Sequence, residues 1–180
     1  MISNYPQIVG LCAGILLLTS LLMVWRHSLL ASITLLAIQG AGLAALVAVI
    51  GAQSDDTELL LVAIVVLAVK GVALPWILAH QSGAATRIVD ESPRLNPTAS
   101  LLLVAGLTIL SYVIFGRILV NLGTVTAHAA PIGLAMVLIG FLLLVTRRRA
   151  RSQLVGFLLL DNGIATVAFL TSGGVPLFLE

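Results

Sequence analysis

Charged residues are scarce in this chain. They make up 9% of its 180 residues, whereas an ordinary soluble domain has about 25%. Hydrophobic residues make up 60%, and the mean hydropathy is +1.18. This composition excludes an ordinary soluble domain and indicates an integral membrane protein.

Cysteine is nearly absent as well. The single cysteine, Cys12, excludes a disulfide within the chain, a CxxC zinc site and a cysteine-ligated iron–sulfur cluster. His27, His80 and His128 stand far apart at the ends of apolar segments, which does not favour a metal site. The sequence also lacks a phosphate-binding glycine loop, a nucleophile–base pair and an HExxH motif. We therefore expect no metal, no cofactor and no catalytic centre in this chain.

Long apolar runs dominate what is present. A run of about 20 apolar residues is long enough to cross a bilayer as a helix. Six such segments and the start of a seventh, after residue 174, are visible: residues 7–25, 29–52, 58–78, 98–122, 130–146 and 153–170. The prediction is an all-α fold, a polytopic transmembrane helix bundle.

A polar loop at residues 80–97 divides these segments. It contains two prolines, Pro93 and Pro97, and is the longest stretch of the chain that is rich in polar residues. We predict an N-terminal three-helix membrane unit at residues 1–79 and a C-terminal membrane unit at residues 98–180.

Arginine placement predicts the orientation of the bundle. If the helices alternate in direction, one side carries Asp55, Asp56 and Glu58, with Arg117 as its one basic residue. Basic residues favour the cytoplasmic side, so the pattern predicts an external amino terminus and three cytoplasmic connections. The arginines on these connections are Arg26, Arg87, Arg94, Arg147, Arg148, Arg149 and Arg151.

The only lysine, Lys70, lies deep inside the third segment. It is twelve residues beyond Glu58, or about 18 Å along a helix. Pro75 cannot donate a hydrogen bond to the carbonyl of Gly71, so we expect a helix break beside the amine. Ionisable residues at this depth are usually functional, which favours a group that takes and releases protons. The alternative is a static ion pair that locks two helices together.

Asp161 stands in the middle of the sixth segment. Ala165 and Ala168 lie on the same helix face and predict the close approach of another helix. Asn162 supplies a hydrogen-bonding neighbour, and Gly163 weakens the helix locally. We interpret Asp161 as a protonatable site, the alternative being a structural acid bonded to a neighbouring helix.

Three further predictions concern Glu180, Gln39 and a pair of glycines. Glu180 ends a Pro-Leu-Phe-Leu-Glu sequence, which indicates that a seventh helix continues beyond it; if it does not, Glu180 is a carboxyl terminus at the interface. Gln39 is the one amide side chain within residues 29–52 and predicts an interhelical hydrogen bond. Gly10 and Gly14 fit a close helix–helix contact.

The pattern around Asp161 is similar to that of a known protein family. Asp161-Asn162-Gly163, preceded by the arginine turn and followed by Gly-Val-Pro-Leu-Phe-Leu-Glu, resembles component E of hydrogenase-4, a membrane-arm subunit of the formate-hydrogenlyase type of complex. The C-terminal half is similar to the small K component of respiratory complex I and to the C component of Mrp cation/proton antiporters. Lys70 with Pro75 matches a Lys-xxxx-Pro feature of the large antiporter-like subunits. The acid here is Asp161, where the family usually has glutamate.

The resemblance implies a subunit without a redox centre in an energy-converting complex of the prokaryotic cytoplasmic membrane. Its partners would be large antiporter-like membrane subunits and a hydrophilic hydrogenase-like arm. Lys70, Asp161 and Glu180 would be the titrating residues of a proton path, with Asn162 and Pro75 in support. The alternatives are a subunit of an Mrp-type cation/proton antiporter and a purely structural or stand-alone membrane protein.

Overall fold

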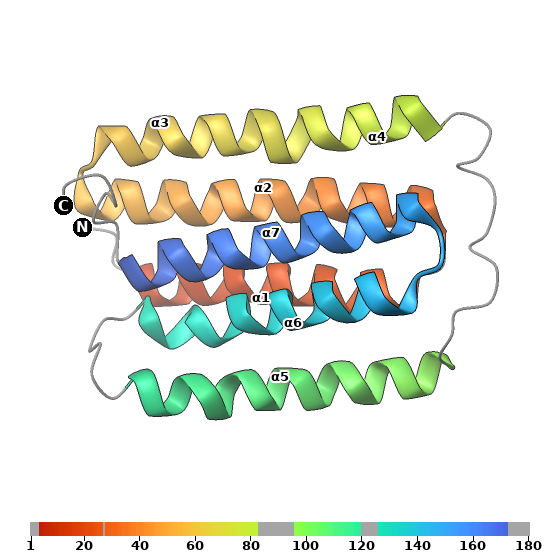
Figure 1. Ribbon diagram of the computed structural model, residues 1–180. Coiled ribbons are helices and arrows are strands. Elements are labelled where there is room, and N and C mark those ends of the chain that lie inside the picture. Colours follow the sequence, from red (N-terminus) through yellow and green to blue (C-terminus); the bar gives the residue numbers. More distant parts are fainter. Residues whose placement is uncertain (1–3, 27, 83–95, 120–125, 173–180) are drawn as a thin grey trace.

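The computed structural model describes residues 4–26, 28–82, 96–119 and 126–172. In these ranges the chain is built from helices, and no strand is present. The helices run back and forth along one axis, as Figure 1 shows. The predicted all-α transmembrane bundle is therefore confirmed.

Each predicted segment that the structure describes is a helix. The helices are α1 (Tyr5–Trp25), α2 (Leu29–Ser54), α3 (Thr57–Val66), the π-helix η1 (Leu67–Ala73), α4 (Leu74–Ser82), α5 (Pro97–Leu119), the short 3₁₀ helix η3 (Ala127–Ala129), α6 (Ala130–Thr146) and α7 (Ala150–Ser172). Because α3, η1 and α4 follow one another without interruption, they form one span.

Five of the described spans are long and apolar enough to cross a membrane. The sixth, α6, has 17 residues, which is the lower limit for a spanning helix. The chain is therefore an integral membrane protein with transmembrane helices. The predicted start of a seventh helix lies outside the described residues.

A pair of aspartates makes the turn between α2 and α3. Asp55 ends α2 with a left-handed backbone, at φ 53°, a conformation that aspartate tolerates better than most residues. Asp56 caps α3, because its carboxylate accepts hydrogen bonds from the backbone N–H groups of Glu58, at 2.9 Å, and Leu59, at 3.3 Å. The polar turn thus satisfies amides that would otherwise lack partners at the start of the helix.

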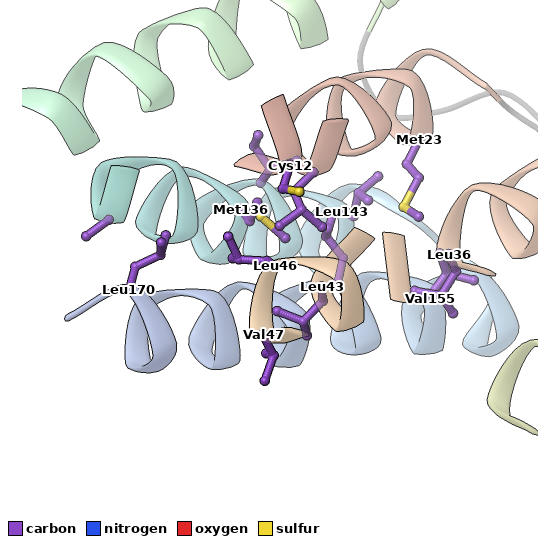
Figure 2. Close-up of a cluster of buried hydrophobic side chains, with 14 of the residues drawn as sticks. Cys12, Met23, Leu36, Leu43, Leu46, Val47, Met136, Leu143, Val155 and Leu170 are labelled. Atoms are coloured by element: carbon purple, nitrogen blue, oxygen red, sulfur yellow. The ribbon is translucent and has the colours of Figure 1, made fainter. Parts of the chain in front are cut away.

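The core lies among α1, α2, α6 and α7. Figure 1 shows the α3–α4 span along one edge of this group and α5 along the opposite edge. Figure 2 shows side chains from these central helices meeting one another. Fully buried examples are Leu16, Leu43, Met136 and Leu159. The outer spans are largely exposed, as expected of helices that face lipid or another protein.

The most extensive contact between two of the described helices joins α6 and α7. A Cβ atom on Gly140 would lie 2.7 Å from the backbone nitrogen of Leu160, and one on Gly163 would lie 2.7 Å from that of Val137. Only glycine allows such an approach, and small residues serve this purpose between membrane helices. Gly163 therefore permits close packing here, where the sequence suggested only a local weakness.

Arginines do gather at one end of the described bundle. Arg26 ends α1, Arg147 ends α6, and the two meet because the Arg147 guanidinium donates to the backbone carbonyl of Arg26 at 2.8 Å. It also donates to the carbonyl of Met23 at 3.2 Å. Arg147 is thus 8% exposed and stabilises the last carbonyls of α1. The sequence indicated mainly a topology signal, with docking of a partner or an anionic lipid as the alternative, and did not indicate this role.

The first residues of the predicted polar loop are helical. Residues 80–82 still belong to α4, and the ring of His80 stacks on Trp76 with centroids 5.4 Å apart. The division into units at residues 1–79 and 98–180 stays a prediction. Helices from both sides of the loop pack against each other, α1 with α6 and α2 with α7.

Candidate functional site: an ion pair within the membrane spans

Lys70 lies on the π-helical segment η1. The wider π-helix hydrogen-bond register is visible at its end, where the N–H of Leu74 donates to the carbonyl of Val69. In that register the next donor would serve the carbonyl of Lys70, but residue 75 is proline and has no N–H. The sequence predicted a helix break that frees the carbonyl of Gly71. The structure instead keeps the span continuous, and in the wider register the donor that proline lacks would face the carbonyl of Lys70 rather than that of Gly71.

Gly40 on α2 faces this segment. A Cβ atom at Gly40 would lie 2.4 Å from the carbonyl oxygen of Lys70 and 2.7 Å from the nitrogen of Gly71. The absence of a side chain therefore lets α2 lie directly against the backbone of the π-helix. Such π-helical turns are rare and are often found at functional sites.

Asp161 on α7 meets Lys70. The lysine Nζ lies 2.5 Å from Oδ2 of Asp161, in an ion pair between residues 91 positions apart. Both residues are central in their spans, since eleven residues separate Asp161 from either end of α7, or about 16 Å of helix. The structure thus brings together the two charges that the sequence singled out separately.

The two partners differ in exposure. Within this chain, 18% of the Lys70 side chain is exposed but 49% of the Asp161 side chain is. The lysine is therefore enclosed between helices, and the carboxylate stands at the surface of the bundle. This arrangement leaves Asp161 open to a group that lies outside the chain.

A chain of buried polar groups lies beside the ion pair. Asn162 Nδ2 donates to Gln39 Oε1 at 3.1 Å, and Gln39 Nε2 donates to Ser20 Oγ at 2.9 Å and to the carbonyl of Leu16 at 3.4 Å. Gln39 and Ser20 are fully buried, at 0% exposure, and Asn162 is 2% exposed. The chain links α7, α2 and α1, and it confirms the predicted interhelical hydrogen bond of Gln39.

Two contacts of α7 differ from those that the sequence suggested. Asn162 points inward and donates a hydrogen bond to Gln39, while its predicted support of Asp161 stays a prediction. The close helix contact is made through Gly163 and its neighbours, while Ala165 and Ala168 remain partly exposed. The reason is helical geometry, because consecutive residues point about 100° apart and so serve different partners.

The remaining candidates are Glu180, the glycine pair and a metal site. Glu180 lies outside the described residues. Gly10 and Gly14 are exposed, and a Cβ atom on either would meet nothing within 4 Å, so they make no close contact in the described chain. Among the described residues, no group of three or more His, Cys, Asp and Glu side chains could hold a metal ion.

Comparison with known proteins gives the family. No protein-family model matches the chain, and no solved structure matches it. It is 45% identical over 180 residues to Uncharacterized protein Rv0085 of Mycobacterium tuberculosis, an alignment that covers 99% of this chain and 81% of that protein. The chain belongs to the family of this mycobacterial protein.

A more distant relative carries a functional name. Hydrogenase-4 component E of Escherichia coli K12 is 24% identical over 174 residues, which cover 97% of this chain and 81% of that protein. The protein of the same name from Shigella flexneri matches to the same extent. The expected resemblance to hydrogenase-4 component E is therefore confirmed as a distant homology. The similarity to the K component of complex I and to the C component of Mrp antiporters stays a prediction.

Proposed function

We propose that this protein is a membrane-arm subunit of an energy-converting, hydrogenase-type complex, and that Lys70 and Asp161 carry protons through it. It would have no redox centre of its own. Its partners would be large antiporter-like membrane subunits and a hydrophilic hydrogenase-like arm. It would lie in the cytoplasmic membrane of a prokaryote with its amino terminus outside, as the arginine pattern favours.

The observation that carries the proposal is the ion pair at mid-span. An isolated charge at the centre of a bilayer costs on the order of 3 kcal/mol by insertion scales. Two opposite charges in contact reduce that cost, but a well-packed apolar pair would do as well for stability alone. Intramembrane groups of this kind mark ion and proton pathways by default.

The geometry suits proton exchange. Lys70 Nζ and Asp161 Oδ2 are 2.5 Å apart, so a proton can pass directly between them. That transfer converts an ammonium and a carboxylate into an amine and a carboxylic acid, and the net charge of the pair stays at zero. The chain therefore need not hold an unpaired charge in the membrane during the step. A proton from outside the chain would enter through the exposed carboxylate.

The distant homology to hydrogenase-4 component E supports the assignment to a multisubunit complex. It does not by itself choose between a hydrogenase-type complex and an Mrp-type antiporter, which would use similar membrane subunits. The direct contact between Lys70 and Asp161 also favours a second candidate, a structural subunit in which the ion pair locks η1 against α7.

Isolation of the protein in a mild detergent tests the assignment to a complex. Mass spectrometry of the isolated material should find antiporter-like membrane subunits together with a nickel–iron or iron–sulfur subunit. Antiporter-like subunits without any redox subunit would favour the antiporter. The protein isolated alone from a mild detergent would contradict the proposal.

A further inference from the structure

Asp161 stands on an otherwise apolar, outward-facing stripe of α7. Its neighbours on this stripe are Leu154, Phe157 and Ile164, of which Phe157 is 55% and Ile164 is 53% exposed. Residues spaced three or four apart share one face of a helix, and these four follow that spacing. The carboxylate therefore lies at the middle of an exposed hydrophobic surface.

A second exposed stripe runs beside Lys70. Val69, Val72 and Trp76, on η1 and α4, are all exposed large hydrophobic residues. The Lys70–Asp161 ion pair connects η1 with α7, the helices that carry these two stripes. We define the Asp161 face as the surface made by Leu154, Phe157, Asp161 and Ile164 together with Val69, Val72 and Trp76.

Lipid alone is a poor partner for this face. Lys70 contacts Oδ2, so in the described part of the chain the second carboxylate oxygen, Oδ1, is left for a group from elsewhere. Hydrocarbon offers no hydrogen bond, and charged side chains within membranes almost always face protein or a water-filled cavity. The groove between α2 and α3 makes the contrast clear: its volume is about 470 Å³ and apolar side chains line it, so acyl chains can fill it.

We propose that a membrane-spanning helix of a partner protein covers the Asp161 face and presents to Asp161 a side chain that donates a hydrogen bond or exchanges a proton. A helix satisfies its own backbone within the membrane. Its apolar residues would pack on the two hydrophobic stripes, and its one polar residue would meet the carboxylate. The inference rests on the proposed function only in requiring a complex, and it adds which surface of this chain carries the contact.

A second copy of the chain fits this face less well. Two copies related by a two-fold axis would place one Asp161 carboxylate against the other, and like charges in a low-dielectric site repel each other. A partner with a lysine, histidine, protonated acid, amide or hydroxyl group is complementary instead. The contact would extend a proton-carrying pair beyond this chain.

Photocross-linking in intact membranes tests the inference. p-Benzoylphenylalanine replaces Phe157 in one variant and Ile164 in another, both next to Asp161 on α7. Leu102 on α5, which is 70% exposed, receives the same group as a control for exposure. Peptides joined to the chain after irradiation are then sequenced by mass spectrometry.

We expect Phe157 and Ile164 to capture the same membrane span of one other protein. That span should contain a Lys, His, Asp, Glu, Asn, Gln, Ser or Thr within two turns of the joined residue. Adducts to lipid, to a second copy or to a wholly aliphatic span would overturn the inference, and so would capture of the same peptide from Leu102. A partner of the expected chemistry that belongs to no hydrogenase-type complex would support this interface and contradict the proposed function.

Discussion

Replacing Gly40 with alanine places a methyl group against the backbone that carries Lys70. The added Cβ atom would lie 2.4 Å from the carbonyl oxygen and 2.5 Å from the carbonyl carbon of Lys70. Both are main-chain atoms of a helix, so no side chain can turn away, and α2 and η1 must separate by about 1 Å to reach normal contact. Overpacking of this kind costs typically about 1–3 kcal/mol. Apart from any gain in helix propensity, we therefore expect the contact to lower the free energy of unfolding of Gly40→Ala by about that amount.

Gly14→Ala is the matched control. Gly14 is exposed, and its added Cβ atom would meet nothing within 4 Å. Both changes gain the same helix propensity, at most about 1 kcal/mol, so the difference between the variants isolates the contact with η1. For a chain of this size each kcal/mol corresponds to roughly 2–4 °C in melting temperature.

The single cysteine provides the assay. Cys12 is 7% exposed in the folded chain, so a thiol-reactive fluorogenic dye labels it as the protein unfolds in detergent. On heating, Cys12 should become labelled at a temperature roughly 2–12 °C lower in Gly40→Ala than in Gly14→Ala. Equal melting temperatures for the two variants would refute the close approach of α2 to the π-helix.

Two more stability predictions follow from buried polar groups. Gln39→Leu and Asn162→Leu should each lower the free energy of unfolding by about 1–3 kcal/mol, since each leaves a buried partner unsatisfied. The double variant should lose less than the sum of the single losses, and strict additivity in the same dye assay would count against the Gln39–Asn162 bond. Arg147→Met should also lower the melting temperature, because the α1 carbonyls lose their charged donor. Arg148 is an exposed neighbour, so Arg148→Met should leave the melting temperature unchanged. An equal decrease in melting temperature for both arginine variants would mean that the contact between Arg147 and α1 does not contribute to stability.

The spans and their ends could be predicted from the sequence because they depend on local properties. Apolar length places a helix in a membrane, and the aspartates at 55 and 56 mark a turn by their own chemistry. Pro75 indicated a disturbance next to Lys70 for the same reason. This disturbance takes the form of a π-helix packed against Gly40. That form depends on how two helices pack, which a local sequence pattern does not indicate.

The sequence identified the two charged residues of the site but did not show that they contact each other. Lys70 and Asp161 are 91 positions apart, and a single sequence carries no information on which buried charges pair. Local rules did not reveal the contacts of Gly163 and Asn162, because their partners lie on other helices. The exposure of the Asp161 carboxylate could not be predicted either, because it depends on how all the helices of the bundle pack together.

Proton translocation by the assembled complex tests the central claim most directly. Membrane vesicles that contain the complex are energised, and proton uptake is followed by quenching of a pH-sensitive dye, with assembly checked by co-isolation. If Lys70 and Asp161 carry protons, Asp161→Asn and Lys70→Met should abolish uptake in assembled complexes, while Asp161→Glu, which keeps the acid, should retain it. Full uptake by assembled Asp161→Asn would contradict the claim and leave the ion pair a structural lock.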